Sequence, residues 1–352
     1  MTQTSTGGAE RTIGLDLGDR WSEYVALDAD GQRVGAGRVR STAEGFAQLS
    51  AQHAGAFVVM ETGTHSPWAA RQFEEAGHPV VVANSSELAL VTSNVRKSDR
   101  RDAEILARLG RADAELLHPV AQREPETQQR LAKLRARRAM VRARAEMINS
   151  VRGTAKSLGT RTASCSTDSF HVRALAGTSP ELRDAVKFEI ASIAALTAQI
   201  LLAEAELEAI AASMPAVAAM RQVPGVGLLI ALTFALTIED PARFARRRDA
   251  AAYFGLAPGR RQSGERDPKM GITKRGNTEA RSLLVQGAHY ILGAHGPDCA
   301  LRRWGLELER TKGKRKAIVA TARKLAVLML ALWATGEVYD PMRGARPAAA
   351  EA

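Results

Sequence analysis

Apolar and polar positions in the first third of the chain follow two different periods. Short apolar runs rich in β-branched residues predict strands, and these runs lie at residues 11–18, 21–29, 33–40, 56–60 and 79–83. Stretches with apolar positions three or four apart predict helices, which begin at Ser41 and cover residues 67–77 and 99–110. Strands that first form a hairpin and later alternate with helices predict an α/β domain with a mixed sheet.

The middle of the chain consists almost entirely of good helix formers. Apolar residues recur at heptad-like steps in residues 130–158 and 180–212, and the polar residues 157–179 connect these segments. The pattern predicts either a helical hairpin or an intermolecular coiled coil. The first segment is basic and the second acidic, which fits nucleic-acid binding or simple solvation of a helix pair. Three arginines of the first segment are candidate nucleic-acid contacts: Arg135, Arg138 and Arg142.

From residue 215 onward the pattern is again mainly helical, with two loops that carry candidate chemistry. The sequence Val223-Pro-Gly-Val-Gly lies between apolar helical runs and resembles the hairpin of a helix-hairpin-helix element. Backbone amides of such a hairpin can hold a DNA phosphate, which makes Gly225 and Gly227 candidate contacts. The same pattern also serves as an ordinary turn between helices. The second loop, residues 256–277, is rich in glycine and arginine.

The charge of the chain narrows the class of partner. With 49 Lys and Arg against 38 Asp and Glu, the 352 residues carry a net charge of +11 and a pI of about 10.1. This excess indicates a polyanionic partner, because cations that bind phosphates gain free energy by releasing counterions. A basic surface without any role in nucleic-acid binding is the alternative.

Cysteine usage and apolar runs indicate the compartment. Cys165 and Cys299 have no disulfide or zinc spacing, which favours a reducing environment. The polar residues 1–10 predict no signal peptide, and charged residues interrupt the apolar stretches before they reach the length of a membrane span. We therefore expect a bacterial cytoplasmic protein, associated with the nucleoid when it acts, and no membrane partner.

Four acidic residues form the candidate catalytic constellation. Asp16 and Glu61 each end a predicted strand, and Asp99 and Asp102 lie three apart on a predicted helix, which places them on one face. This is the layout of the RNase H-like metal nucleases. Hard Mg²⁺, or Mn²⁺, takes carboxylate oxygens as ligands and helps in-line displacement at a phosphodiester. Each acid alone could equally cap a turn or pair with a nearby arginine.

The first strand also allows a competing interpretation. Residues 13–18, Ile-Gly-Leu-Asp-Leu-Gly, resemble the first phosphate loop of actin-like ATPases and sugar kinases. Those enzymes need a second glycine-rich phosphate hairpin and an adenosine-binding glycine pair, and neither pattern is found in the sequence. The strongly basic charge also disfavours that class.

Several sequence pieces together resemble one family, the "IS one-ten" insertion-sequence transposases, which are bridge-RNA-guided DEDD recombinases. They cover most of the chain in the family's order, and they are Ile13-Gly-Leu-Asp16, Val59-Met-Glu61-Thr-Gly, Lys97-Ser-Asp99-Arg-Arg-Asp102-Ala, Pro224-Gly-Val-Gly227, Gly255-Leu-Ala-Pro258, Gln262-Ser263-Gly264 and Ile272-Thr-Lys-Arg-Gly-Asn277. The third piece and the two around the second loop are the most specific.

The resemblance implies a fold class and a division of the chain. It implies an α/β RNase H-like (RuvC-like) DEDD domain at residues 1–123 and an α-helical coiled-coil and dimerisation region at 124–214. A mainly α-helical transposase domain with a helix-hairpin-helix-like element would follow at 215–340. The alanine- and proline-rich composition of the end of the chain separately predicts a disordered tail at 341–352. The resemblance also implies a homo-oligomer, a dimer that becomes a tetramer in the synaptic complex.

The resemblance further implies a chemistry. Its metal-binding tetrad falls on Asp16, Glu61, Asp99 and Asp102, and its nucleophile on Ser263. Attack of Ser263 on DNA would form a 5′-phosphoserine link between protein and strand, so that rejoining needs no nucleotide cofactor. Its partners would be donor and target DNA and a noncoding bridge RNA. Four cations flank the serine and are candidate phosphate contacts: Arg260, Arg261, Lys274 and Arg275.

Two other functional classes remain open from the sequence. A metal-dependent RuvC-like nuclease or junction resolvase would use the acids and not Ser263. A nucleic-acid-binding protein without enzymatic activity would use neither. A serine in a Gln-Ser-Gly loop is, without the resemblance, an ordinary turn residue.

Overall fold

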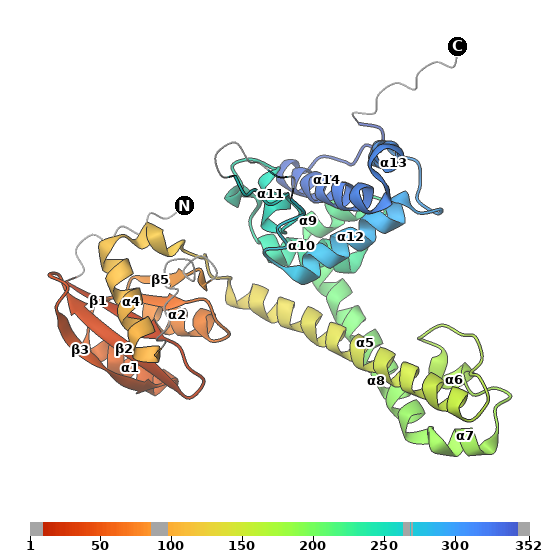
Figure 1. Ribbon diagram of the computed structural model, residues 1–352, viewed down its shortest axis with the longest axis horizontal. Coiled ribbons are helices and arrows are strands. Elements are labelled where there is room, and N and C mark those ends of the chain that lie inside the picture. The colour runs from red at the N-terminus through yellow and green to blue at the C-terminus, as the bar shows by residue number, and fades with distance from the viewer. Residues whose placement is uncertain (1–9, 86–97, 263–267, 269, 344–352) are drawn as a thin grey trace, which may run out of the picture. The chain divides into compact units, whose positions relative to one another are not determined.

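The computed structural model describes residues 10–85, 98–262, 268 and 270–343. The chain divides into two compact units, Met1–Glu124 and Pro125–Ala352. The first unit holds a mixed five-stranded sheet with helices, and the second is mostly helical (Figure 1).

The elements of the first unit lie close to their predicted positions. They are β1 (Arg11–Asp16), β2 (Trp21–Asp28), β3 (Arg33–Arg40), α1 (Ala43–Gln52), β4 (Phe57–Glu61), α2 (Ser66–Glu75), β5 (Val80–Ala83), α4 (Asp99–Ala112) and the short 3-10 helix η1 (Ala114–Leu117). The helix expected to begin at Ser41 starts at Ala43, and Thr42 caps it, since the Thr42 hydroxyl accepts a hydrogen bond from the Gly45 backbone amide.

The strand order in the sheet is β3-β2-β1-β4-β5. The strands β1, β2 and β3 pair antiparallel, whereas β4 pairs parallel with both β1 and β5. The turn at Asp30 and Gly31 joins β2 to β3, and Gly31 has the positive φ of 80° that such a turn requires. The predicted mixed sheet is therefore confirmed.

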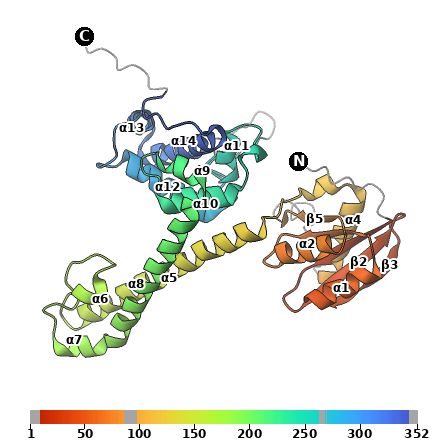
Figure 2. The ribbon, with the colours of Figure 1, turned by 180° about the vertical axis from the view of Figure 1, so that it is seen from behind.

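Helices cover both faces of this sheet (Figures 1 and 2). Ile13 and Leu15 of β1 lie on the face covered by α1 and α2, where Phe46 and Phe73 fill the core. The other face packs against α4 through a smaller core that includes Leu106. Because β1 is buried on both sides, its run of apolar residues has no polar interruption before Asp16.

The second unit begins with a pair of long helices, α5 (Pro125–Ser157) and α8 (Lys187–Ala212), which pack against each other within one chain. The opposite charges predicted for the two segments meet between them. The Lys133 ammonium lies 2.7 Å from a Glu206 carboxylate oxygen, and Arg137 pairs with Glu204. Of the two sequence alternatives, the helical hairpin is the arrangement within the chain.

The prediction of one continuous helix over residues 180–212 is wrong. The segment forms α7 (Pro180–Ala185) and α8, and Val186 between them has φ −108° and ψ 9°. The Val186 side chain is fully buried in the core at this end of the hairpin, together with Phe170 of the short helix α6 (Phe170–Arg173). The break therefore coincides with tertiary packing of Val186, which the apolar spacing of the sequence does not reveal.

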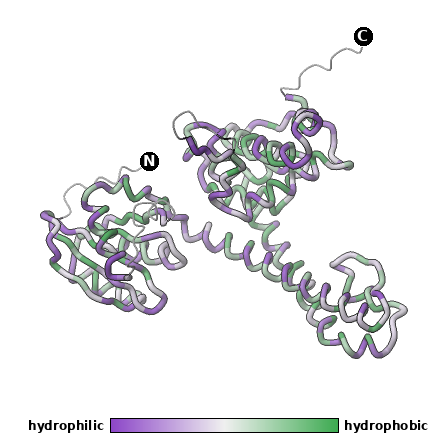
Figure 3. The backbone as a smooth tube through the Cα atoms, in the orientation of Figure 1, coloured by the Kyte–Doolittle hydropathy of each residue, from purple (hydrophilic) through white to green (hydrophobic). Residues whose placement is uncertain are grey.

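The remaining helices enclose the main core of the second unit. They are α9 (Pro215–Arg221), α10 (Leu228–Ile238), the 3-10 helix η2 (Pro241–Arg243), α11 (Asp249–Tyr253), α12 (Thr278–Leu292), α13 (Ala300–Lys312) and α14 (Lys314–Thr335). Leu134 of α5 and Leu207 of α8 join this core. Much of α14 is hydrophobic, whereas the start of α5 is mainly hydrophilic (Figure 3).

Charged residues interrupt both of the long apolar helices as expected, with Glu204 in α8 and Arg323 and Lys324 in α14. By length and composition α8 and α14 could each cross a membrane, which is weak evidence because core helices meet the same criteria. Half of the apolar window of α14 is buried inside the protein, where Leu325 and Met329 are inaccessible to solvent. These apolar residues belong to the core of the second unit.

Candidate nuclease and strand-transfer site

Two of the predicted acids lie side by side at one edge of the sheet. Leu15 of β1 pairs in parallel register with Met60 of β4, so Asp16 and Glu61 occupy the next positions on adjacent strands. Both acidic residues are half-buried. Adjacent strands lie about 4.8 Å apart, which brings the two carboxylates within reach of one phosphate group.

Both acids point to the face of the sheet that α4 covers. Gly14 and Val59 face α4, since added Cβ atoms on Gly14 and Gly110 would lie 1.9 Å from the Ala103 carbonyl oxygen and 2.4 Å from a Val59 methyl carbon, respectively. Side chains two residues apart on a strand share a face. The carboxylates that follow Gly14 and Val59 by two positions therefore lie on this side.

The direction of α4 brings its first turn to the same edge. Near its start, α4 crosses β1 at the point where Ala103 contacts Gly14. At the other end of the helix, the Arg111 guanidinium donates a hydrogen bond of 3.2 Å to the Ala29 carbonyl oxygen, in the hairpin beside the start of β1. The helix therefore runs opposite to β1, and its amino terminus lies at the end of the sheet where β1 and β4 finish.

The other two predicted acids occupy that first turn. Asp99 is exposed and Asp102, which directly precedes Ala103, is half-buried. The structure thus places all four acids at one edge of the sheet, with Asp16, Glu61 and Asp102 the more enclosed three.

Carboxylates fit a hard divalent cation in kind, since Mg²⁺ and Mn²⁺ are bound in proteins mainly by oxygen ligands. Within the described residues, however, no set of three or more His, Cys, Asp or Glu side chains is gathered closely enough to hold a metal ion. The four acids share an edge and a face without forming a closed coordination sphere.

The second loop of the sequence is organised by pairing between two of its motifs. The arm that begins at Gly255 runs antiparallel to the arm that ends at Lys274, with an isolated bridge between Pro258 and Ile272. The Thr273 amide donates to the Ala257 carbonyl oxygen at 2.9 Å. Two sequence motifs separated by more than ten residues therefore form the base of one loop.

Two glycines allow the backbones at the base of this loop to approach closely. Gly255 has a φ of 67°, and a Cβ on it would lie 2.2 Å from the Arg275 carbonyl oxygen. A Cβ on Gly276 would lie 2.1 Å from the Tyr253 carbonyl oxygen. Arg281 of α12 donates to the carbonyl oxygens of both Phe254 and Arg275, at 3.1 and 3.0 Å.

Ser263, the predicted nucleophile, lies outside the described residues. The described parts of its loop carry the four predicted cations, all of them exposed: Arg260, Arg261, Lys274 and Arg275. Lys274 has a left-handed backbone conformation with φ 56°. Sequence reasoning did not single out Arg281 or Asn277 as supports of this loop, although Asn277 before a helix is a recognisable cap.

The predicted helix-hairpin turn packs tightly on α12. Gly225 has a φ of 78°, and a Cβ on it would lie 2.9 Å from the Gly287 carbonyl oxygen. Gly227 precedes α10 as its N-cap, and a Cβ there would meet no atom within 4 Å. An open cleft of about 500 Å³ lies along this turn, lined also by Arg221 and Tyr290. The turn is exposed to a ligand on one side and fixed on the other.

The three arginines predicted on α5 are exposed. Arg138 pairs with Glu279 of α12 at 3.2 Å. Arg144, which the sequence did not distinguish from its neighbours, is instead buried and forms an ion pair of 2.8 Å with Asp168. Basic residues of α5 thus serve both structure and surface charge.

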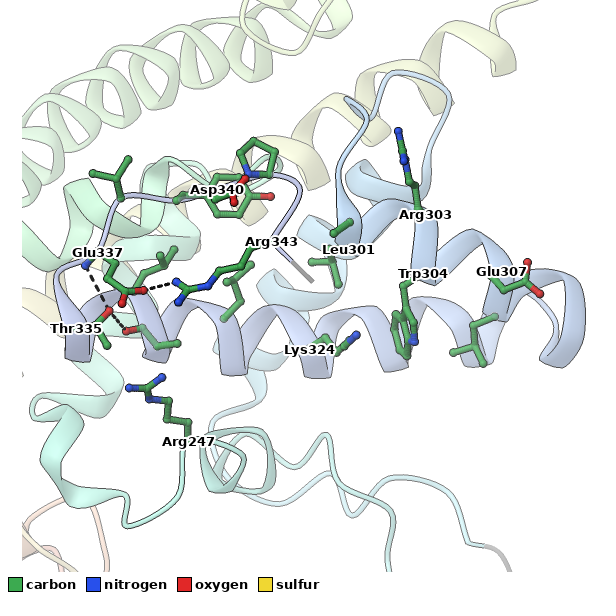
Figure 4. Close-up of a pocket in the computed structure, with 18 of the residues that line it drawn as sticks. Arg247, Leu301, Arg303, Trp304, Glu307, Lys324, Thr335, Glu337, Asp340 and Arg343 are labelled. Carbon is green, nitrogen blue, oxygen red and sulfur yellow. Dashed lines mark hydrogen bonds and ion pairs between the residues drawn. The ribbon is translucent and has the colours of Figure 1, made fainter. Parts of the chain in front are cut away.

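A cavity of about 840 Å³ lies in the second unit between α13, α14 and residues 337–343 (Figure 4). The Lys324 ammonium lies 4.1 Å from the centre of the Trp304 ring, and burial lowers the pKa of Lys324. Burial also raises the pKa of the Tyr339 hydroxyl, which is hydrogen-bonded with Cys299. The described residues that line the cavity include none of the predicted catalytic residues.

Comparisons with known proteins agree over both units. A family model described as "Transposase IS116/IS110/IS902 family" matches residues 217–302. A second model, described as "Transposase" and named for the DEDD transposases of IS110, matches residues 13–159. The first match covers both glycine loops, and the second covers the four acids.

Similar proteins are known in several bacteria. The transposase for insertion sequence element IS1111A of Coxiella burnetii is 27% identical over 338 residues, which cover 94% of this chain and 91% of the relative. The transposase for insertion sequence element IS1328 of Yersinia enterocolitica is 26% identical, with 93% and 98% covered. A probable family 20 transposase of Pseudomonas aeruginosa is 28% identical, with 81% and 86% covered.

The first unit is an α/β unit that carries the acids, and the second is a basic helical unit. Transposase models match both, and together these findings define an enzyme that acts on DNA. The chain belongs to the IS110 family of insertion-sequence transposases. The family resemblance expected from the sequence is confirmed.

Proposed function

We propose that this transposase cuts and rejoins DNA through a covalent link between Ser263 and the 5′-phosphate of the cut strand. The observation that carries the proposal is the paired base of the 255–276 loop, which holds the two motifs around Ser263 in a fixed, cation-rich frame. Donor and target DNA are the substrates.

The proposed reaction conserves the phosphodiester energy. The Ser263 Oγ attacks the phosphorus, a new P–O bond to serine forms as the bond to the 3′ oxygen breaks, and the departing 3′ oxygen takes up a proton. A 3′-hydroxyl of the exchanged strand then attacks the phosphoserine, and the proton returns to the serine oxygen. Neither step needs a nucleotide cofactor.

The acids of the first unit would hold Mg²⁺ or Mn²⁺ through Asp16, Glu61, Asp99 and Asp102. A bound divalent ion neutralises charge that develops on the phosphate oxygens. The strand order and the carboxylates at the ends of β1 and β4 support an RNase H-like, RuvC-like assignment of residues 1–123. In this proposal the acids and Ser263 form one composite site that requires more than one subunit.

Exposed cations would hold the nucleic acids. Arg260, Arg261, Lys274 and Arg275 contact phosphates near the serine, because guanidinium and ammonium groups pair well with phosphate oxygens. The amide-bearing turn at Gly225 and Gly227 adds a phosphate contact of the helix-hairpin-helix kind.

A noncoding bridge RNA is the proposed guide, on the strength of the family resemblance. The exposed arginines of α5 are its candidate contacts: Arg135, Arg138 and Arg142. In this proposal residues 124–214 form the dimerisation region, residues 215–340 the transposase domain and residues 341–352 the tail. The protein acts in the cytoplasm at the nucleoid, without a membrane partner.

One face of α8 supports a contact between copies of the chain, a dimer that becomes a tetramer in the synaptic complex. Phe188 and Leu202 are 76% and 62% exposed. They belong to a series of exposed apolar residues at alternating steps of three and four, the spacing of a coiled-coil seam. The series is Phe188, Ala191, Ala195, Ala198, Leu202, Ala205, Ala209 and Ala212.

Light scattering tests this contact. Replacing Phe188 and Leu202 together by Glu should convert the protein to monomer. Val172→Glu is the matched control, because Val172 is 73% exposed but lies outside α8. An unchanged mass in the double variant rules out this seam.

The decisive experiment for the chemistry mixes purified protein, element-end RNA and labelled donor DNA with Mg²⁺, and detects a protein–DNA adduct that survives denaturation. The adduct should vanish with Ser263→Ala and weaken at least a hundredfold with Asp16→Asn. EDTA should suppress it, and Mn²⁺ should restore it.

A metal-dependent RuvC-like nuclease or junction resolvase without a serine nucleophile is the second candidate. It is favoured by the fact that all four acids lie within the first compact unit. Cleavage without any adduct, unaffected by Ser263→Ala, would establish it in place of the serine mechanism.

A further inference from the structure

An exposed tryptophan begins β2 close to the acids. Trp21 is 39% exposed, although tryptophan side chains are usually well buried. The guanidinium carbons of Arg38 and Arg40, both on β3, lie 4.7 and 5.1 Å from the centre of the Trp21 ring. The three side chains form a patch of one aromatic ring and two cations, which we call the Trp21 patch, and the Glu23 carboxylate lies 3.9 Å from the Arg38 guanidinium.

This patch lies on the face of the sheet that carries the acids. Val25 and Leu27 of β2 pack against α4, so Trp21 and Glu23, at alternate positions of the same strand, share that face. On β3, Ala36 also packs on the α4 side, and the two arginines follow it by two and four residues. The opposite face receives the alternate residues of both strands.

Strand register gives the position of the patch along the sheet. Asp16, the last residue of β1, pairs with Glu23 of β2. Trp21 lies two residues beyond Glu23, about 7 Å along the strand, and pairs with Arg40. The patch therefore lies beside the end of β1, on the β2–β3 side of Asp16, with Glu61 on the other side.

The chemistry of the patch fits one kind of ligand. An exposed aromatic ring stacks on a nucleobase regardless of its sequence, and neighbouring arginines hold the phosphates of the same strand. A paired duplex hides its base faces, so the ligand must be unpaired at this point. Because the patch lies beside the acids of the proposed cleavage site, the unpaired strand at this point is the DNA strand that is cut.

We propose that Trp21, with Arg38 and Arg40, is a stacking platform for an unpaired base of the DNA strand that is cut, next to its scissile phosphate. This proposal rests on the proposed function of the acids and names how the strand is held there. Trp21 positions the strand, and the two arginines neutralise its backbone.

Binding to a fluorescent 16-nucleotide oligo(dT), measured by anisotropy with the full-length Asp16→Asn protein, tests the platform without any cleavage. Trp21→Ala should weaken binding about tenfold, and Trp21→Phe should restore most of it, because stacking needs only an aromatic face. Arg38→Gln with Arg40→Gln should lower the salt dependence of the logarithm of the affinity by about 1.4.

Arg33→Gln is the matched control. Arg33 begins the same strand β3, but it lies at the opposite end of the sheet and pairs with Glu104. This variant should bind oligo(dT) as the parent protein does. Equal affinity of Trp21→Ala and its parent would overturn the platform.

A photocrosslink identifies the strand. Donor DNA with 5-bromouracil beside the cut position should crosslink to the peptide that contains Trp21. Crosslinking of that peptide only to bromouridine-substituted RNA would overturn the assignment to DNA. The Ser263→Ala protein should still crosslink, so a failure of the serine chemistry is separated from a failure of the platform.

Discussion

Gly14 of β1 and Ala103 of α4 meet so closely that a Cβ on Gly14 would lie 1.9 Å from the Ala103 carbonyl oxygen. This contact sets the distance between α4 and the sheet. It also sets where Asp102, the neighbour of Ala103, lies relative to Asp16, two residues after Gly14. Backbone packing at a single glycine therefore fixes the spacing of the candidate metal ligands.

Gly14→Ala should destabilise the first unit by about 2–3 kcal/mol, because the helix must move away from the sheet to admit the methyl group. Urea unfolding measures this change. Gly153→Ala on α5 is the control: a Cβ there meets no atom within 4 Å, and alanine should stabilise the helix by about 0.5–1 kcal/mol. Equal stability of Gly14→Ala and the parent would contradict the close contact.

Gly255→Ala should abolish the protein–DNA adduct. The added methyl group would collide with the Arg275 backbone, and the positive φ of Gly255 disfavours any side chain. The base of the serine loop would then open. Gly259→Ala in the same loop should retain the adduct, because its Cβ would meet the nearest atom at 3.6 Å, an ordinary contact. Loss of the adduct in both variants would mean that the loop tolerates no substitution at all.

Asn277→Ala should lower the free energy of unfolding of the second unit by about 1–2 kcal/mol. The Asn277 side-chain oxygen accepts hydrogen bonds from the Glu279 and Ala280 amides at 2.9 and 3.0 Å, and its amide donates to the Thr237 hydroxyl. Asn277→Asp keeps both acceptor contacts and loses only the donor, so it should cost less. Denaturant midpoints distinguish the three proteins, and an Asp variant as weak as the Ala variant would argue against capping.

His53 should make the first unit sensitive to acid. Burial lowers the pKa of His53, and Arg11 and His78 lower it further. The unfolded chain therefore binds a proton more readily, and stability that is fully present above pH about 6.5 is lost as the pH falls through the folded-state pKa. Urea midpoints between pH 7.5 and 5 should fall less in His53→Gln than in the parent. His295→Gln, at an exposed histidine, should follow the parent curve.

Much of the first unit could be predicted because its strands are short apolar runs that end in charge or glycine. The ends of β1 and β4 at Asp16 and Glu61 follow from that pattern. The face and direction of α4 do not, because they depend on contacts made at Gly14 and Gly110, which no local period encodes. That all four acids share an edge is therefore visible only in the structure.

The second unit was less predictable for the same reason. The apolar spacing around Val186 continues the helical period, and the break between α7 and α8 coincides with burial of that side chain in a non-local core. Likewise, the loop from residue 256 contains no strand period, and its arms pair because Gly255 and Gly276 allow two backbones to touch. Non-local backbone contacts decided both outcomes.

The hairpin of α5 and α8 has a separate core at each end. Leu134 and Leu207 anchor one end in the main core, while Ile148 and Ile193 pack with Phe170 at the other. Between these two ends, α5 and α8 pack mainly against each other. Removing or inserting matched heptads in both helices should therefore change the distance between the two cores, and it should leave both cores intact. The length of this hairpin is a dimension that evolution, or an engineer, can adjust independently of the chemistry.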